Sequence, residues 1–336
     1  MRASGRRATA VAVVGALVFM HAPTAFAYLE FGVRAGNRNV TLKWTQLPVR
    51  YFISDRATVP GVSVSDFQAA IGRAFNTWQA VPSAAITYQF GGFTGAAPGD
   101  DDGVSTLGFL NRPDLDRVLA STSFVVDTST GALLESDILF NSTFAWSASV
   151  AGDPTRFDLE SIALHEIGHF SGLGHSALGE TELREGGGRR VIASEAVMFP
   201  IAFAAGSTAG RTLKADDIAG ISDLYPEDAG AVGSISGRVT KNGQPIFGAH
   251  VVAFDPATLK MVGGFSVNAQ GEFSIGSLPP GPRILRVEPL DDADVESFFS
   301  GSQTVDADFR VAFFDRVVVV PRGGGASPVE LKVVPK

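Results

Sequence analysis

Apolar and β-branched residues run together at four places before residue 230, with the spacing of half-buried or buried strands. Gly, Asp and Asn clusters separate these runs and are typical of turns. The last two runs are joined by a predicted turn at 127–131, which favours an antiparallel pair. The pattern therefore predicts strands at residues 49–54, 85–90, 118–126 and 133–141.

Helical spacing occurs in the same part of the chain. One helix is expected to run from Asp66, as its capping residue, to about Val81. Two further helices are expected to begin near Asp158 and near Lys214. The apolar face of the first is formed by Phe67, Ile71, Ala74, Phe75 and Trp78.

The pattern changes near residue 230. After it come seven or so short strands divided by Gly, Pro and Asn-Gly turns, with no helical spacing. Such a series predicts a small all-β sandwich. A chain of 336 residues is long enough for two folded domains. We therefore expect one domain at 28–228, a linker at 229–232 and a second domain at 233–336.

The first 27 residues have the pattern of a secretory signal peptide. Three arginines are followed by an apolar run from Ala8 to Met20 and then by Ala25-Phe26-Ala27, a small-x-small cleavage site. A membrane anchor is the alternative, but the run is too short to span a bilayer. We expect a secreted protein, extracellular or in the periplasm or cell envelope, without a membrane span.

The net charge and the cysteine content exclude some classes of partner and of covalent cross-link. Loss of three arginines and no acidic residue would change the net charge from −8 to −11. An acidic chain is poorly suited to nucleic acid or anionic membranes, so no nucleic-acid partner is expected. The chain has no cysteine, and disulfides are therefore excluded.

The chemistry is indicated by residues 165–175, which read HEIGHFSGLGH. On a helix, His165 and His169 lie one turn apart on one face and can bind one zinc ion. Glu166 is free to act as a base. Gly172 lets the chain leave the helix and brings His175 round as a third ligand. The alternative is a histidine-rich helix end whose imidazoles only pack in the core.

This motif, H-E-x-x-H-x-x-G-x-x-H, resembles that of the metzincin zinc endopeptidases. In that clan a methionine turn lies below the metal, and Met198 within residues 196–200 matches it. Ser176, Lys43-Trp44 and the segment 212–225 make the chain similar to the matrixins, the matrix metalloproteinase family, over about residues 43–226.

The resemblance implies an α+β fold, a twisted mixed sheet with helices, which carries the active-site helix in a cleft. It implies that residues 118–120 form an edge strand that binds an extended peptide substrate. It also implies that Ile162 and Pro200-Ile201 wall a substrate pocket, although plain core packing is the alternative for these residues.

The chain departs from the matrixin pattern at several positions. No histidine of the expected mature chain precedes His165, so the family's second, structural zinc is not expected. Latency through a propeptide cysteine is excluded because there is no cysteine. The insertion 179–195 is expected to form a flexible flap near the cleft. The loop 91–103 contains Asp100, Asp101 and Asp102, for which a solvated loop and a Ca²⁺ site are both open.

The second domain resembles the carboxypeptidase regulatory-like, transthyretin-like sandwich. This resemblance rests on residues 236–239, Gly248-Ala249, Gly271 with Phe273, and 278–281. It would not bring carboxypeptidase activity, but it could bind a surface, a glycan or a protein target.

Taken together, the sequence predicts a secreted zinc metalloendopeptidase with Glu166 as general base. The alternative is a binding or adhesion protein with a degenerate metalloprotease fold.

Overall fold

The computed structural model describes residues 11–12, 30–35, 38–185, 187–299 and 304–336. The predicted signal peptide, residues 1–27, lies outside the described residues except for the two-residue strand β1 (Val11–Ala12). None of the helices in the described ranges is long and apolar enough to cross a membrane.

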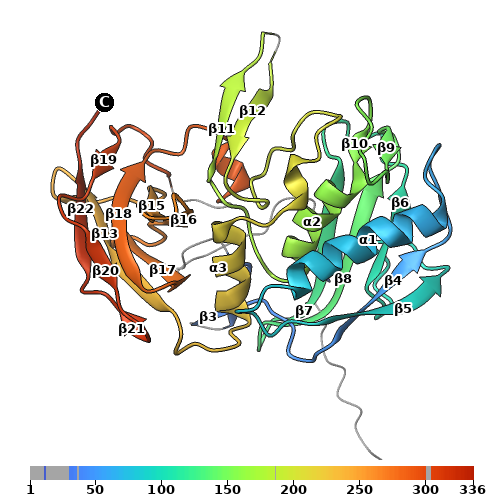
Figure 1. Cartoon of the computed structure of the whole chain (residues 1–336), viewed down its shortest axis with the longest axis horizontal. Coiled ribbons are helices and arrows are strands. Elements are labelled where there is room, and N and C mark those ends of the chain that lie inside the picture. The colour runs from blue at the N-terminus through green and yellow to red at the C-terminus, as the bar shows by residue number, and fades with distance from the viewer. Residues whose placement is uncertain (1–10, 13–29, 36–37, 186, 300–303) are drawn as a thin grey trace, which may run out of the picture.

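A six-stranded mixed sheet forms the scaffold of the N-terminal part (Figure 1). Its strand order is β1-β7-β8-β6-β4-β5, and β7 pairs antiparallel with β8 while β8, β6, β4 and β5 are parallel. The two-residue β1 pairs with the far edge of β7. The main strands are β4 (Val49–Ser54), β5 (Tyr88–Thr94), β6 (Thr106–Leu110), β7 (Ala120–Asp127) and β8 (Ala132–Asn141). This mixed sheet with helices agrees with the predicted α+β class.

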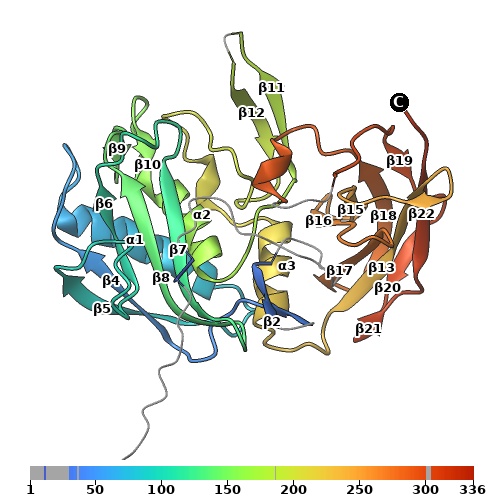
Figure 2. The ribbon, with the colours of Figure 1, turned by 180° about the vertical axis from the view of Figure 1, so that it is seen from behind.

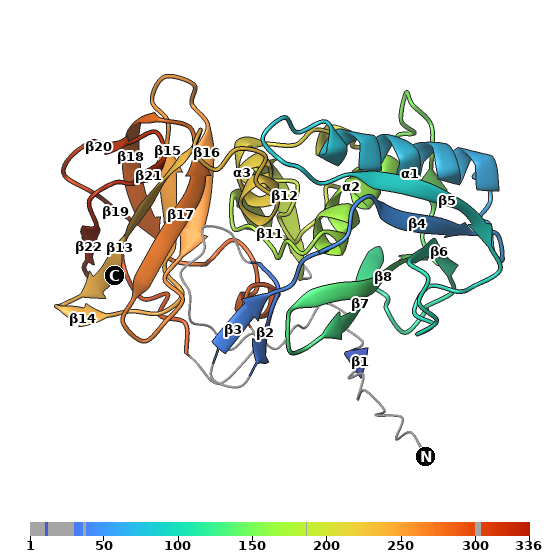
Figure 3. The same cartoon turned by 90° about the horizontal axis from the view of Figure 1, so that it is seen from below.

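Two helices, α1 (Val64–Gln79) and α2 (Leu159–Phe170), lie together on one face of this sheet (Figure 3). The buried residues of α1 include all five that its helical spacing predicts. Its cap is Ser63 and not Asp66, because the Ser63 hydroxyl accepts from the Asp66 amide while the Asp66 carboxylate reaches back. The predicted cap residue is therefore the third residue of a capping box.

The start of α2 agrees with the expectation from sequence. Asp158 caps it, and its carboxylate accepts from the backbone N–H of Ser161 at 2.9 Å. Arg211, the last residue of the short 3-10 turn η1 (Ala209–Arg211), forms an ion pair with the same carboxylate. The cap thus fixes both the beginning of the helix and the loop that passes over it.

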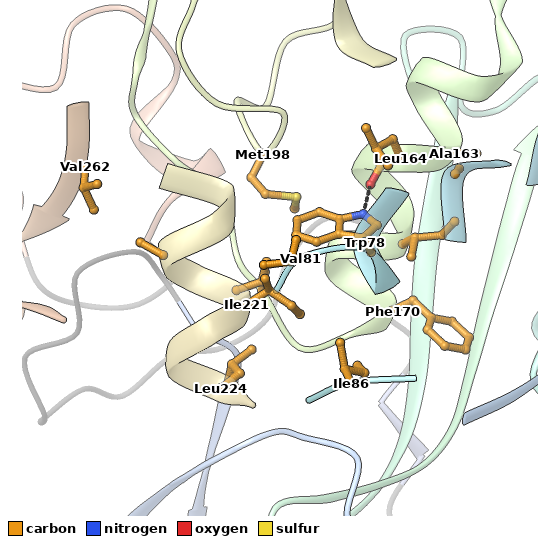
Figure 4. Close-up of a cluster of buried hydrophobic side chains, with 14 of the residues drawn as sticks. Trp78, Val81, Ile86, Ala163, Leu164, Phe170, Met198, Ile221, Leu224 and Val262 are labelled. Atoms are coloured by element: carbon orange, nitrogen blue, oxygen red, sulfur yellow. Dashed lines mark hydrogen bonds between the residues drawn. The ribbon is translucent and has the colours of Figure 1, made fainter. Parts of the chain in front are cut away.

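The core between α1, α2 and α3 (Ala215–Leu224) is built around Trp78, whose side chain is fully buried. Its indole N–H donates to the carbonyl of Leu164 at 2.8 Å, as Figure 4 shows. This bond joins α1 directly to α2, the helix that carries the histidine motif. The position of the motif is therefore fixed from below by a buried aromatic side chain.

Residues 233–333 form two five-stranded sheets, which we call the C-terminal sheets (Figure 2). In the first sheet, β13 (Gly233–Lys241) pairs with β14, β17, β21 and β22. In the second sheet, β15 (His250–Phe254) lies between β16 and β18. The remaining strands are β14 (Gln244–Pro245), β16 (Met261–Phe265), β17 (Glu272–Leu278), β18 (Gly281–Glu288), β19 (Ala312–Phe313), β20 (Val318–Val320), β21 (Gly324–Gly325) and β22 (Val329–Val333).

Several details differ from the sequence pattern. β6 was not predicted, and β5 continues into the expected loop as far as Thr94. In the C-terminal part a 3-10 turn, η2 (Val295–Ser297), interrupts the expected all-β pattern, and the short strands β19 and β20 follow it. The insertion 179–195 contains a paired hairpin of β11 (Gly179–Leu183) and β12 (Arg189–Ser194).

Helix α3 lies between the six-stranded mixed sheet of the N-terminal part and the C-terminal sheets (Figures 1 and 2). The Asp216 carboxylate accepts from the backbone N–H of Gly263 at 2.7 Å, and the hydroxyl of Ser277 donates to Asp223 at 3.2 Å. One continuous cluster of buried apolar residues includes Trp78, Met198 and Ile235. The two parts therefore share a core and polar contacts in this structure.

Candidate metal centre

The three motif histidines converge on one point. His165 and His169 come from successive turns of α2, and His175 follows the helix after a loop. One ring nitrogen of each lies within 4.8 Å of the others. Among the described residues, this is the one group of three or more His, Asp or Glu side chains close enough to share a metal ion. The geometry thus brings together the three residues predicted as ligands.

Backbone carbonyls fix the orientation of all three rings. The Nδ1 atoms of His165, His169 and His175 lie 2.8, 2.8 and 2.7 Å from carbonyl oxygens of Val197, Leu173 and Ser297, respectively. A carbonyl oxygen can only accept, so each Nδ1 carries the proton and donates. In the neutral ring the lone pair is then on Nε2, the atom left free to bind a metal.

The donor set fits a zinc ion. Tetrahedral zinc with Zn–N distances of about 2.0–2.1 Å would place two ligand nitrogens about 3.3 Å apart. The Nε2 atoms of His169 and His175 are 3.1 Å apart. Burial lowers the pKa of His175 to about 3 and that of His169 well below its usual value, with repulsion between the rings adding to the effect. Neutral imidazoles, as metal ligands require, therefore prevail at neutral pH.

Glu166 lies beside the ligands without belonging to their group. Its side chain is buried, with 6% of its surface exposed, and one oxygen accepts from the hydroxyl of Thr122 at 2.6 Å. Burial raises the pKa of Glu166 to about 7, and the Thr122 hydrogen bond opposes this rise. A carboxyl group with a pKa near neutrality can both take and return a proton. Thr122, on β7, was not singled out in the sequence.

Two of the three glycines in residues 165–175, Gly168 and Gly172, are required by the structure for different reasons. A Cβ atom on Gly168 would lie 2.2 Å from the sulfur of Met198, so only glycine leaves room for this side chain beneath α2. Figure 4 shows the Met198 sulfur pointing at the indole of Trp78, and Met198 is 3% exposed. Gly172 has a φ of +105°, and a Cβ there would meet the carbonyl oxygen of Leu42 at 2.3 Å. This turn allows the chain to leave the helix before His175.

The segment around Met198 is held by a carboxylate that the sequence pattern did not reveal as important. Asp217, buried at the start of α3, accepts from the backbone N–H groups of Val197 and Met198 at 2.9 and 3.1 Å and of Lys214 at 2.8 Å. Burial raises its pKa to about 6, and these amides oppose the rise. Since the carbonyl of Val197 accepts from His165, Asp217 supports a candidate metal ligand through one intervening residue.

Substitution of Asp217 by alanine is expected to lower the free energy of unfolding by about 2–4 kcal/mol, because it leaves three amides near Met198 and Lys214 without their acceptor. Denaturant titration of the purified variants measures this loss. Asp217→Asn, which retains one acceptor oxygen, should lose less. A change below about 0.5 kcal/mol for the alanine variant would refute this role for the carboxylate.

Ser176 and Pro200 have different surroundings. Ser176 is 2% exposed; its backbone N–H donates to the carbonyl of Met198 at 2.9 Å, and its hydroxyl hydrogen-bonds the buried Asp216. Pro200, with Ile162 and Ile201, lines the cleft above the histidines. Ser176 therefore connects the third histidine to residues 196–200 around Met198, which we call the methionine segment. Pro200 faces the cleft.

The cleft has a volume of about 1060 Å³ and includes all three histidines and Glu166 in its lining. Residues 118–122, just before and at the start of β7, line it. β7 itself is paired on its outer side with β1 at Phe124 and Val125, and the edge-strand role of residues 118–120 stays a prediction. The hairpin β11–β12 and residues 294 and 296–298 also contribute. The predicted flap therefore lies at the cleft, together with the segment that follows β18.

The carboxylates near the loop 91–103 are used by the backbone. Asp137 accepts from the amides of Gly99 and Thr106 at 2.6 and 2.7 Å, and Asp102 accepts from Val104 at 2.9 Å. Glu135 accepts from Gly103. These hydrogen bonds between carboxylates and backbone amides hold the loop 91–103 in place. The Ca²⁺ site stays a prediction.

Comparison with known proteins agrees with the geometry. Residues 43–183 match the family model described as Matrixin. Metalloendoproteinase 1 of Glycine max is 41% identical over 96 residues, 26% of this chain and 24% of that protein. Metalloendoproteinase 5-MMP of Arabidopsis thaliana is 41% identical over 71 residues, 21% of this chain and 15% of that protein. The matches thus span about a quarter or less of these relatives. They identify residues 43–183 as matrixin-like and support a metalloprotease hydrolase at the level of the family.

Proposed function

We propose that this protein is a secreted zinc-dependent endopeptidase that hydrolyses internal peptide bonds of protein substrates. The observation that carries the proposal is the convergence of three imidazoles, with Nε2 free in each, beside a buried carboxyl group in an open cleft. His165, His169 and His175 would hold the ion. When bound, zinc supplies a Lewis acid that lowers the pKa of water and polarises a carbonyl group.

The protein's own residues move the protons in this proposal. Glu166 takes a proton from the attacking water and passes it to the leaving amine. Thr122 donates to one carboxylate oxygen of Glu166 at 2.6 Å, and the other oxygen would take the proton. An extended substrate would pair with the chain at residues 118–120, before and at the start of β7. Ile162 and Pro200-Ile201 would wall one pocket for a substrate side chain.

Several finer statements belong to the same proposal. Secretion rests on the pattern of residues 1–27, and the division into 28–228, a linker at 229–232 and 233–336 rests on the change of pattern near residue 230. A carboxypeptidase regulatory-like module that binds a surface, glycan or protein is proposed for the last segment on its sequence resemblance. The supporting role of Met198 rests on its position beneath α2.

A chelator-sensitive cleavage assay separates this function from the alternative of an adhesion protein with a degenerate protease fold. The purified protein should degrade casein or gelatin, lose activity on removal of the metal, and regain it when zinc is returned. Metal-loaded, folded protein that cleaves neither substrate nor a broad peptide library would favour the adhesion function.

A further inference from the structure

The third histidine differs from the other two in what holds it. The carbonyl that orients His169 belongs to Leu173, four residues later in the chain. The carbonyl that orients His165 belongs to Val197, the residue before Met198. The carbonyl that orients His175 belongs to Ser297, 122 residues later in the sequence. The Nδ1···O distance of 2.7 Å makes this bond as short as the other two.

Ser297 is the last residue of η2, the turn that follows β18 of the C-terminal sheets. The turn is closed by hydrogen bonds from the amides of Ser297 and Phe298 to the carbonyls of Asp294 and Val295, at 2.9 and 3.0 Å. The position of the Ser297 carbonyl is therefore set by the turn and by what anchors the turn.

Phe298 anchors the turn in a buried apolar cluster. Its side chain is 4% exposed, and the cluster also contains Phe265 of β16 and Phe199, the residue after Met198. The ring centroids of Phe298 and Phe265 are 5.7 Å apart. Through Phe298, the turn whose carbonyl receives the His175 proton is therefore packed against the C-terminal sheets, in a cluster that extends to the residue after Met198.

The hairpin β11–β12 is attached to the same loop (Figures 1 and 2). The amide and hydroxyl of Thr181 donate to the side chain and the carbonyl of Asp292 at 2.8 and 2.7 Å. Arg189 donates to the carbonyl of Asp291 at 2.9 Å. The insertion that follows His175 is therefore tied to the segment that orients His175.

We infer that residues 291–298, carried by the C-terminal sheets, complete the metal centre by orienting His175. His175 needs such support because it lies beyond the end of α2, where no helical backbone fixes its ring. Groups that orient ligands in this way typically change metal affinity 10- to 100-fold when they are lost, on the order measured for other metal sites. Ser297 is a positioning residue in this account, since its carbonyl acts through His175. The inference rests on the proposed zinc site.

Zinc affinity of full-length Phe298→Ala tests this inference, with Phe313→Ala as the matched control. Phe313 lies in β19 of the same sheets but is 64% exposed. Competition with a fluorescent chelator should show zinc binding about 10- to 100-fold weaker in Phe298→Ala and unchanged in Phe313→Ala. Wild-type protein that binds zinc with the same affinity as a folded Phe298→Ala variant would overturn the inference and leave the zinc site intact. Wild-type protein without zinc affinity would instead overturn the proposed function.

A second measurement needs no substitution and so does not depend on the folding of a variant. In NMR spectra of the zinc-loaded protein, the His175 ring should carry its proton at Nδ1, and that proton should exchange slowly because it is donated to the Ser297 carbonyl. A rapidly exchanging His175 ring proton, or protonation at Nε2, would contradict the assignment of Ser297, whatever the affinity measurements give.

Discussion

Replacing Glu166 by alanine is expected to lower kcat by about 10²–10⁴-fold while the protein still binds one zinc ion. The carboxyl group is outside the histidine cluster, so its loss removes the proton carrier and no ligand. Burial raises the pKa of Glu166 to about 7, so this carboxyl group can take and return a proton near neutral pH. Peptide-cleavage kinetics and metal analysis on the same preparation measure the two quantities.

Two further variants make the Glu166 result specific. Glu166→Gln retains the shape and an oxygen that can accept from Thr122, so its expected loss of activity isolates the proton transfer from packing. Glu227→Ala, at an exposed position after α3, should be as active as the wild type. Turnover of Glu166→Gln within about tenfold of the wild type would refute Glu166 as the base.

Replacing His169 by alanine is expected to remove both zinc and activity. His169 is the most buried of the three histidines that converge, and a site with two remaining imidazoles lacks the three protein ligands of a catalytic zinc centre. Zinc per chain, measured after dialysis against a weak chelator, should fall from about one to near zero. Cleavage should fall in parallel.

His250→Gln is the matched control for this substitution. His250 is also buried, at 2% exposure, but its Nδ1 atom contacts Glu288 in the C-terminal sheets, away from the cluster. Its zinc content should equal that of the wild type, even if the sheets become less stable. An unchanged zinc content in His169→Ala would contradict the ligand assignment.

The sequence predicts most of the features that depend on residues close together in the chain. The histidine spacing is set by one helical turn, so His165 and His169 could be placed on one face of α2 without a structure. The cap of α2 at Asp158 is a neighbour in sequence, and the buried face of α1 follows from periodicity. β4 has the bounds that its apolar run predicts. Each of these depends on residues only a few positions apart.

What sequence reasoning missed depends on contacts between distant residues. Thr122 reaches Glu166 across 44 residues, and Ser297 reaches His175 across 122. The carbonyl of Ser297 has no sequence signal at all, because every residue carries one. Asp217 could have been suspected from an acidic residue in the first turn of α3, but its amide partners lie in a different segment. The cap of α1 was misplaced because both Ser63 and Asp66 are good capping residues.

We propose that one zinc ion on His165, His169 and His175, with Glu166 as base, performs the cleavage. A titration of metal-free wild-type protein with zinc, in which peptide cleavage is followed at each addition, measures this most directly. We expect no cleavage before zinc is added, a rise that ends at about one equivalent, and no rise in the His169→Ala variant. Cleavage by the metal-free protein, or a rise with zinc in His169→Ala equal to that of the wild type, would contradict it.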